Sequence, residues 1–162
     1  MFRLSARADP AFLAEMLYEA VYWHDDGAEE RPPLDALLAN PETARYVADW
    51  GRPGDAAVFA LDRRDEPVGA AWYRRFTSAA PGYGYVADDI PEVSIGVFSE
   101  FRGQRVGSLL MGSLIAKAQS SAERALSLSV HRDNPARRLY ARLGFEVERD
   151  EGDTYTMLLD LS

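Results

Sequence analysis

The chain is 162 residues long, 47% hydrophobic, and carries a formal net charge of −8 at pH 7, which predicts a single domain, residues 1–162, with a substantial core. The acidic balance argues against a general nucleic-acid or anionic-membrane surface, although it suits a partner that bears an amine. The chain has no Cys and only two His, which excludes disulfides and a Cys nucleophile and argues against a metal site.

The first third of the chain predicts a short strand at residues 2–5 followed by helices. Asp9-Pro10 is typical of an N-cap followed by Pro at the first helical position, and an apolar stripe continues from there. A loop rich in aromatic and acidic residues, 22–30, separates this helix from two shorter ones. The helices expected are Pro10 to about Tyr22, Leu34–Leu38 and Pro41–Trp50, the last with Asn40 as its N-cap.

The middle of the chain predicts an antiparallel hairpin and then a strand that leads into a helix. The hairpin is formed by residues 56–61 and 67–76, and Trp72 and Tyr73 in it are expected to pack in the sheet. A long loop at 77–89, rich in Ala, Pro, Gly and Tyr, is a candidate functional loop. Strand spacing from Glu92 to Val97 gives way to helix spacing from Val106.

The last third alternates strand, helix and hairpin. Residues 125–131 alternate apolar and polar side chains, which is typical of a strand. Asn134-Pro135 opens a helix that Gly144 closes. Residues 145–148 and 155–161 predict a closing hairpin. The whole order indicates an α/β fold with a central mixed, mostly antiparallel sheet of six to seven strands flanked by about four helices.

The turn between the central strand and its helix, Arg102-Gly-Gln-Arg-Val-Gly107, predicts an anion site. Its glycines allow backbone N–H groups to approach a ligand, and the helix that follows points its free N–H groups at the bound charge. Two arginines would add charged contacts to a phosphate. No Gly-Lys-Ser/Thr follows, so the turn is not a nucleoside-triphosphate P-loop.

Two motifs resemble the GCN5-related N-acetyltransferase (GNAT) family. Arg102–Ser108 resembles the family's acyl-CoA-binding motif, Arg/Gln-x-x-Gly-x-Gly/Ala, with Arg105 where the middle Gly is usual. Asn134 to Phe145 resembles the second motif, Asn-x-x-Ala-x-x-Leu-Tyr-x-x-x-Gly-Phe, with Ala136 one place early. Because a non-Gly residue favours a negative φ, we expect Arg105 at an ordinary helical start, its side chain turned toward solvent or phosphate.

The resemblance implies an N-acetyltransferase that moves an acetyl group from acetyl-CoA to a primary amine of a small molecule or peptide. It places the pantetheine arm along the central strand, the pyrophosphate at the turn, and Asn134 against the cofactor. Tyr140 matches the family tyrosine that donates a proton to the departing thiolate; the alternative is a core tyrosine. The cofactor-binding residues implied are Ile95, Gly96, Val97, Arg102, Gly103, Gln104, Arg105, Val106, Gly107, Ser108 and Asn134.

The general base is left open among several residues. Family members often carry a Glu at the place of Glu92, which could accept the amine proton directly or through water; the alternative is an exposed carboxylate at a strand end. Asp88, Asp89, His24 and His131 are further candidates.

The rival function from another class is a non-catalytic acyl-CoA-binding sensor or interaction module on the same fold. The sequence shows no apolar run near the ~18 residues of a membrane span and no long apolar core of a signal peptide, so we expect a cytoplasmic protein. The identity of the acceptor and the oligomeric state are left open, although a homodimer is common in such folds.

Overall fold

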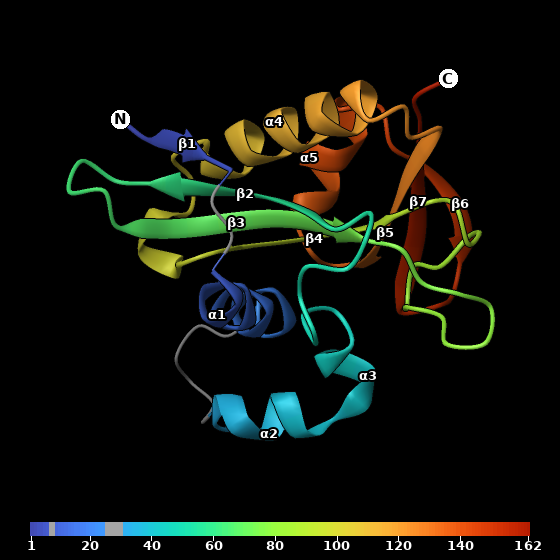
Figure 1. Cartoon of the computed structure of the whole chain (residues 1–162), viewed down its shortest axis with the longest axis horizontal. Helices are drawn as coiled ribbons and strands as arrows, with labels where there is room; N and C mark the ends of the chain where they lie inside the picture. Colours follow the sequence, from blue (N-terminus) through green and yellow to red (C-terminus); the bar gives the residue numbers. More distant parts are fainter. Residues whose placement is uncertain (7–8, 25–30) are drawn as a thin grey trace.

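The computed structural model describes residues 1–6, 9–24 and 31–162, and its centre is a seven-stranded sheet (Figure 1). The strands are β1 (Arg3–Ser5), β2 (Ala56–Leu61), β3 (Pro67–Arg74), β4 (Glu92–Val97), β5 (Ala125–His131), β6 (Glu146–Asp150) and β7 (Thr154–Asp160). They lie in the order β1-β2-β3-β4-β5-β7-β6. Only β4 and β5 pair parallel, and the other neighbours are antiparallel. The mixed, mostly antiparallel sheet expected from the sequence is confirmed.

Helices cover both faces of the sheet, and each face has its own hydrophobic core. They are α1 (Pro10–Val21), α2 (Leu34–Ala39), α3 (Pro41–Ala44), α4 (Val106–Ser120) and α5 (Ala136–Arg142). α4 and α5 lie on one face, and α1 lies on the other with α2 and α3 beyond it (Figure 1). Leu110 and Leu114 of α4 belong to the first core, and Leu13 and Met16 of α1 to the second. None of the described helices is long and apolar enough to cross a membrane.

α1 lies directly against β4 at Gly96. A Cβ atom added to this glycine would lie 2.1 Å from the carbonyl oxygen of Met16 in α1. No side chain fits in that space, so the glycine permits the helix to contact the strand backbone. This close contact brings the C-terminal part of α1 beside the middle of β4, where a ligand site is expected from the sequence.

The sheet opens between its two parallel strands. β4 pairs with β5 at a single position, Glu92 with Ser127, whereas β5 and β7 pair along seven residues. The Ser127 amide also donates to the carbonyl of Pro91 at 3.0 Å, just before β4 begins. From Val93 onward the described part of β4 has no ladder partner on its β5 side. The two strands therefore diverge, and the gap leaves a row of backbone groups for a ligand.

Several boundaries differ from the sequence prediction, and the largest difference is at α3. The helix expected at Pro41–Trp50 ends at Ala44, and hydrogen-bonded turns follow. The side chain of Arg74 donates to the carbonyls of Arg45 and Ala48 at 3.0 and 2.6 Å, so these groups are satisfied without a longer helix. The strand predicted to Phe76 ends at Arg74. Residues 25–30 of the predicted loop lie outside the described residues.

Candidate active site

A cavity of about 350 Å³ lies along the open side of β4 and under the start of α4. Of the thirteen residues implied by the two motifs, eleven line it: Ile95, Gly96, Val97, Arg102, Gly103, Arg105, Val106, Gly107, Ser108, Asn134 and Tyr140. We call it the turn cavity. The exceptions are Glu92, which lines a neighbouring cavity, and Gln104, whose side chain donates to the carbonyl of Glu100 at 3.2 Å.

The N-terminus of α4 forms the anion end of the turn cavity. Gly103 has φ of 79° and a Cβ position with no neighbouring atom within 4 Å, so the turn is open at that point. A side chain at Gly107 would start 3.3 Å from Leu139, within the cavity lining. Arg102 is fixed by hydrogen bonds to the carbonyls of Val97 and Trp23 at 3.1 and 3.2 Å. A phosphate fits here because open backbone and a helix N-terminus meet two arginines.

The prediction of a negative φ at Arg105 is wrong. Arg105 has φ of 67° and ψ of 15°, in the left-handed region, and directly precedes the first residue of α4. The turn reverses the chain between Phe101 and α4 through two positive-φ residues, Gly103 and Arg105. A non-Gly residue in this conformation costs roughly 1–2 kcal/mol. The side chain of Arg105 is exposed and lines the turn cavity, which agrees with the expected orientation toward solvent or phosphate. The backbone that places it there is strained.

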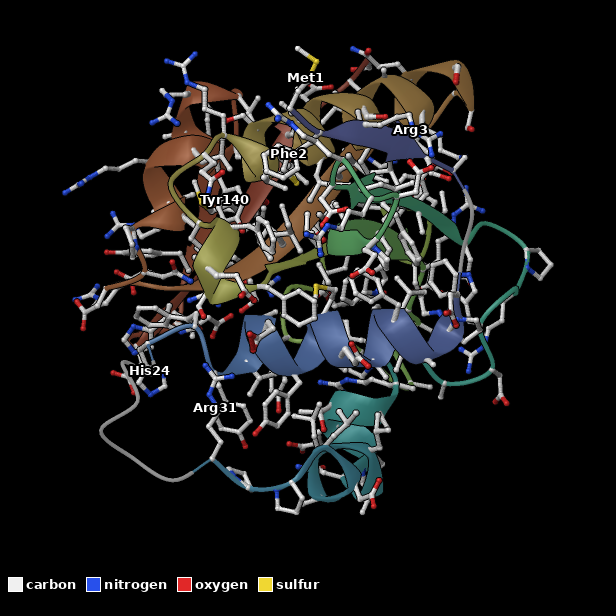
Figure 2. All side chains as sticks on the ribbon, turned by 90° about the vertical axis from the view of Figure 1, so that its left-hand side faces the viewer. Met1, Phe2, Arg3, His24, Arg31 and Tyr140 are labelled. Carbon is white, nitrogen blue, oxygen red and sulfur yellow. The ribbon has the colours of Figure 1, made fainter. Side chains whose placement is uncertain are left out.

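Tyr140 lies where the turn cavity meets a second cavity of about 170 Å³. It is buried on α5 and lines both spaces. No described residue forms a hydrogen bond with its hydroxyl, although the ring packs edge-on against Phe145. Burial raises the pKa of Tyr140, so the hydroxyl keeps its proton throughout the neutral range. In Figure 2, Tyr140 lies beside the α5 ribbon, and His24 lies on the same side of the molecule where α1 ends.

The second cavity contains Glu92, and we call it the Glu92 cavity. Both strands of the gap line it, together with Thr43, Tyr46 and Tyr83 from outside the sheet. Glu92 is only 3% exposed, which rejects the reading of an exposed strand-end carboxylate. Tyr46 donates to Glu92 Oε2 at 2.6 Å and accepts from the Tyr83 amide at 2.8 Å. Glu92 Oε1 is buried and forms no hydrogen bond with any described group.

The carboxyl of Glu92 is tuned to the neutral range. Burial is the largest influence and raises its pKa to about 7. The hydrogen bond from Tyr46 and the nearby backbone amide of Gly84 both lower the pKa, but by less. The positive charge of Arg45 lowers it as well. A carboxyl with this pKa is a stronger base than an ordinary Glu and is still half ionised at pH 7. Its free oxygen, Oε1, is therefore suited to accept a proton.

The other candidate bases have structural roles or lie further from the gap. Asp88 accepts the Ser78 amide at 3.1 Å and the Tyr85 hydroxyl, and Asp89 pairs with Arg124 at 2.6 Å. His131 lines a third, outer cavity with Trp23, whereas His24 stacks edge-on against Trp23 and lines none of these cavities. No group of three or more His, Asp or Glu within the described ranges is placed to hold a metal ion.

Sequence reasoning did not identify Tyr46, Tyr83 or Arg45 as site residues. The first two lie 46 and 9 positions from Glu92 in the chain, in segments without a motif. The only signal was the unusual content of Gly and Tyr in residues 77–89. The expectation that Trp72 and Tyr73 pack in the sheet is confirmed, since both are at most 2% exposed and Trp72 donates to the carbonyl of Tyr46.

Residues 17–145, most of the chain, match the acetyltransferase (GNAT) family, and the chain belongs to that family.

Solved structures share the fold over nearly the whole chain. The PaiA N-acetyltransferase of Thermoplasma acidophilum in complex with coenzyme A is 15% identical, with a TM-score of 0.71 and 99% of each chain covered. The phosphinothricin acetyltransferase of Sinorhizobium meliloti in complex with acetyl-CoA is 24% identical, with a TM-score of 0.68, covering 99% of this chain and 89% of that one. YncA of Salmonella typhimurium with acetyl-CoA is 21% identical, with a TM-score of 0.67 and coverage of 99% and 94%. No curated protein sequence matches the chain.

Proposed function

We propose that the chain is one acetyltransferase domain that moves an acetyl group from acetyl-CoA to a primary amine of a small molecule or peptide. The observation that carries this proposal is the position of Tyr140. It lines the turn cavity, which fits a phosphate-bearing acyl donor, and also the Glu92 cavity, which holds a base of neutral pKa. An acid and a base therefore meet at the gap between β4 and β5.

The residues of the turn cavity would hold acetyl-CoA, which supplies an acetyl group already activated as a thioester. The turn from Gly103 to Ser108 would bind the pyrophosphate, with Arg102 and Arg105 at its rim. The unpaired backbone of Ile95–Val97 would bind the pantetheine arm as an added strand does. Asn134 contributes to both ends of the site, because its side chain caps the start of α5 at 2.9 Å and lines all these cavities.

Proton transfers are assigned to two residues. Glu92 Oε1 accepts a proton from the attacking amine, directly or through water, while Tyr46 holds Oε2. Tyr140 donates its proton to the sulfur of the departing coenzyme A. The raised pKa of Tyr140 keeps the proton in place before reaction, and the low polarity of its surroundings favours its return once the thiol has left.

The test is calorimetry with coenzyme A together with thiol release from acetyl-CoA over a panel of amines. Gly107→Asp places a negative charge in the turn cavity and should abolish binding. Gly112→Asp is the matched control, because Gly112 is an exposed glycine of the same helix with no atom near its Cβ position. Absence of binding by the wild type at millimolar coenzyme A would overturn the proposal. Binding without acetylation of any amine would support the sensor instead.

A further inference from the structure

The outer cavity adjoins the Glu92 cavity. It has a volume of about 690 Å³. It shares Ala20, Val21, Tyr83, Ser129, Val130 and Asn134 with the Glu92 cavity. An acceptor whose amine reaches Glu92 would therefore place the rest of its structure in the outer cavity, and the groups that line it select the acceptor.

Among the described residues, three charged or titratable side chains other than tyrosine line the outer cavity, and two of them already have partners. Glu151 is paired with Arg149 at 2.8 Å. His131 accepts the Asp133 amide through Nδ1 at 3.1 Å and has the Asp133 carboxylate at 3.9 Å. The third is Arg45, which has no carboxylate within ion-pair distance among the residues that the structure describes. Of these three described side chains, Arg45 is the one without an ion-pair partner.

The guanidinium of Arg45 is held in place by aromatic rings and by a carbonyl. Its carbon lies 4.8 Å from the ring centre of Tyr83 and 5.6 Å from that of Tyr46. Nη1 donates to the carbonyl of Pro81, and Nε is buried without a hydrogen-bond partner. Eight arginines of the described residues pair with carboxylates, whereas Arg45 lines a cavity without an ion pair, like Arg102 and Arg105. A cation that is fixed and partly desolvated, with no carboxylate paired to it, is a site for an anion.

Arg45 and Glu92 are neighbours in the same network. Tyr46, the next residue in the chain, donates to Glu92 Oε2 at 2.6 Å. Pro81, which accepts from Arg45, precedes Gly82, whose Cβ position lies 2.3 Å from Glu92 Oε1. The Glu92 carboxyl and the Arg45 guanidinium therefore contact the same small set of residues, and the charge of Arg45 acts on the carboxyl.

We propose that the acceptor is a small amine that carries an anionic group, a carboxylate or a phosphonate, and that Arg45 binds this group. The inference rests on the proposed acetyl transfer and adds the acceptor class to it. The amine lies at Glu92 and the anion in the outer cavity, so the acceptor resembles an amino acid more than a polyamine or an alkylamine.

The experiment compares matched acceptors with wild-type protein and variants of Arg45. Each of several L-amino acids is tested beside its carboxamide and its decarboxylated amine, with aminoalkylphosphonates as a separate arm. The readout is kcat/KM for thiol release from acetyl-CoA. Arg45→Gln should lower the ratio of kcat/KM for the anionic amines to kcat/KM for their uncharged analogues by roughly 10–100-fold, the loss expected for one charged hydrogen-bonded contact. The ratio is compared because loss of the Arg45 charge also raises the pKa of Glu92, which affects both classes of amine. Arg45→Lys should recover part of the loss, because lysine keeps the positive charge but lacks the planar guanidinium that can donate two parallel hydrogen bonds.

Arg63→Gln is the matched control. Arg63 is exposed in the turn between β2 and β3 and lines none of the cavities, so its loss changes net charge alone. Unchanged coenzyme A affinity and melting temperature in Arg45→Gln would show that the site is intact. Equal acetylation of anionic and uncharged amines, with a ratio that Arg45→Gln leaves unchanged, would overturn the inference and leave the acetyltransferase standing. The inference would also be overturned if the protein binds coenzyme A but acetylates no anionic amine. Loss of coenzyme A binding in the wild type would overturn both.

Discussion

Replacing Glu92 by Gln should change the pH dependence of both activity and stability, in opposite directions. The variant keeps the shape of the side chain and an oxygen that can accept from Tyr46, but it removes the titrating group. Glu92 is buried, and its pKa rises from 4.5 to about 7 because ionisation would leave a poorly solvated charge. The fold therefore favours the protonated carboxyl, whereas the catalysis that we propose requires the ionised one.

The size of the stability effect follows from the two pKa values. Below pH 4.5 the carboxyl is protonated in the folded and the unfolded chain, and the group contributes no pH dependence. Between pH 4.5 and 7 the unfolded chain ionises first, so the stability of the wild type falls as the pH rises. The full loss above pH 7 is roughly 3 kcal/mol, or about 6–12 °C in melting temperature for a chain of this size. Glu92→Gln should not show this loss.

The activity of the wild type should change with pH in the direction opposite to its stability. The kcat/KM of the wild type should fall about tenfold for each pH unit below 7, because the ionised fraction of Glu92 falls in that proportion. Glu92→Gln should lower kcat/KM at pH 8 by ~10²–10⁴-fold. The kcat/KM of the variant should not fall further as the pH decreases through 7.

Two measurements check this reasoning: thermal melts of both proteins from pH 4 to 9, and pH–rate profiles over the same range. Glu148→Gln is the matched control, since Glu148 is exposed on β6 and lines none of the cavities. Its melting curve should follow that of the wild type at every pH. If the wild type and Glu92→Gln lose stability in parallel as the pH rises, the carboxyl does not titrate near neutrality, and the assignment of the base is wrong.

Three further substitutions test other parts of the site. Tyr140→Phe should lower kcat by ~10²–10⁴-fold with little change in coenzyme A affinity, as measured by kinetics and calorimetry. Gly96→Ala should destabilise the fold by more than about 2 kcal/mol in denaturant unfolding, because its Cβ would lie 2.1 Å from the Met16 carbonyl. Arg105→Gly should leave the melting temperature unchanged or slightly higher, because relief of the left-handed strain offsets the entropy of Gly, while coenzyme A affinity falls.

The elements that local patterns specify could be predicted from the sequence. The strands at Ala56–Leu61 and Ala125–His131 begin and end as predicted, and α1 begins at the Asp9 cap, whose carboxylate accepts the Ala11 amide at 3.1 Å. The end of α3 could not be predicted, because Arg74, thirty residues later in the chain, binds the carbonyls that a longer helix would have used. Hydrophobic periodicity describes only local sequence, so it does not reveal a contact between residues so far apart in the chain.

The residues that line the turn cavity could be predicted from the sequence, whereas most of those around Glu92 could not. The turn and Tyr140 lie in two compact motifs, so their residues could be assigned one by one. The error at Arg105 had a signal that was available: the family usually places Gly there, and Gly is the residue of left-handed turns. The network of Arg45, Tyr46 and Glu92 is assembled from segments far apart in the chain, and no local pattern joins them.

The loop at residues 77–89, a candidate functional loop by sequence, contributes the Tyr83 side chain to the site and also contributes backbone. A side chain at Gly82 would lie 2.3 Å from Glu92 Oε1, and one at Gly84 would lie 2.6 Å from the carbonyl carbon of Leu128 in β5. Both glycines let the loop pack against the gap between β4 and β5, where its backbone adds to the burial of Glu92. Asp88, a candidate base by sequence, instead fixes the loop through the Ser78 amide. Because a side chain at either glycine would collide with Glu92 or with β5, only bare backbone permits this close approach, and burial is the largest cause of the raised Glu92 pKa.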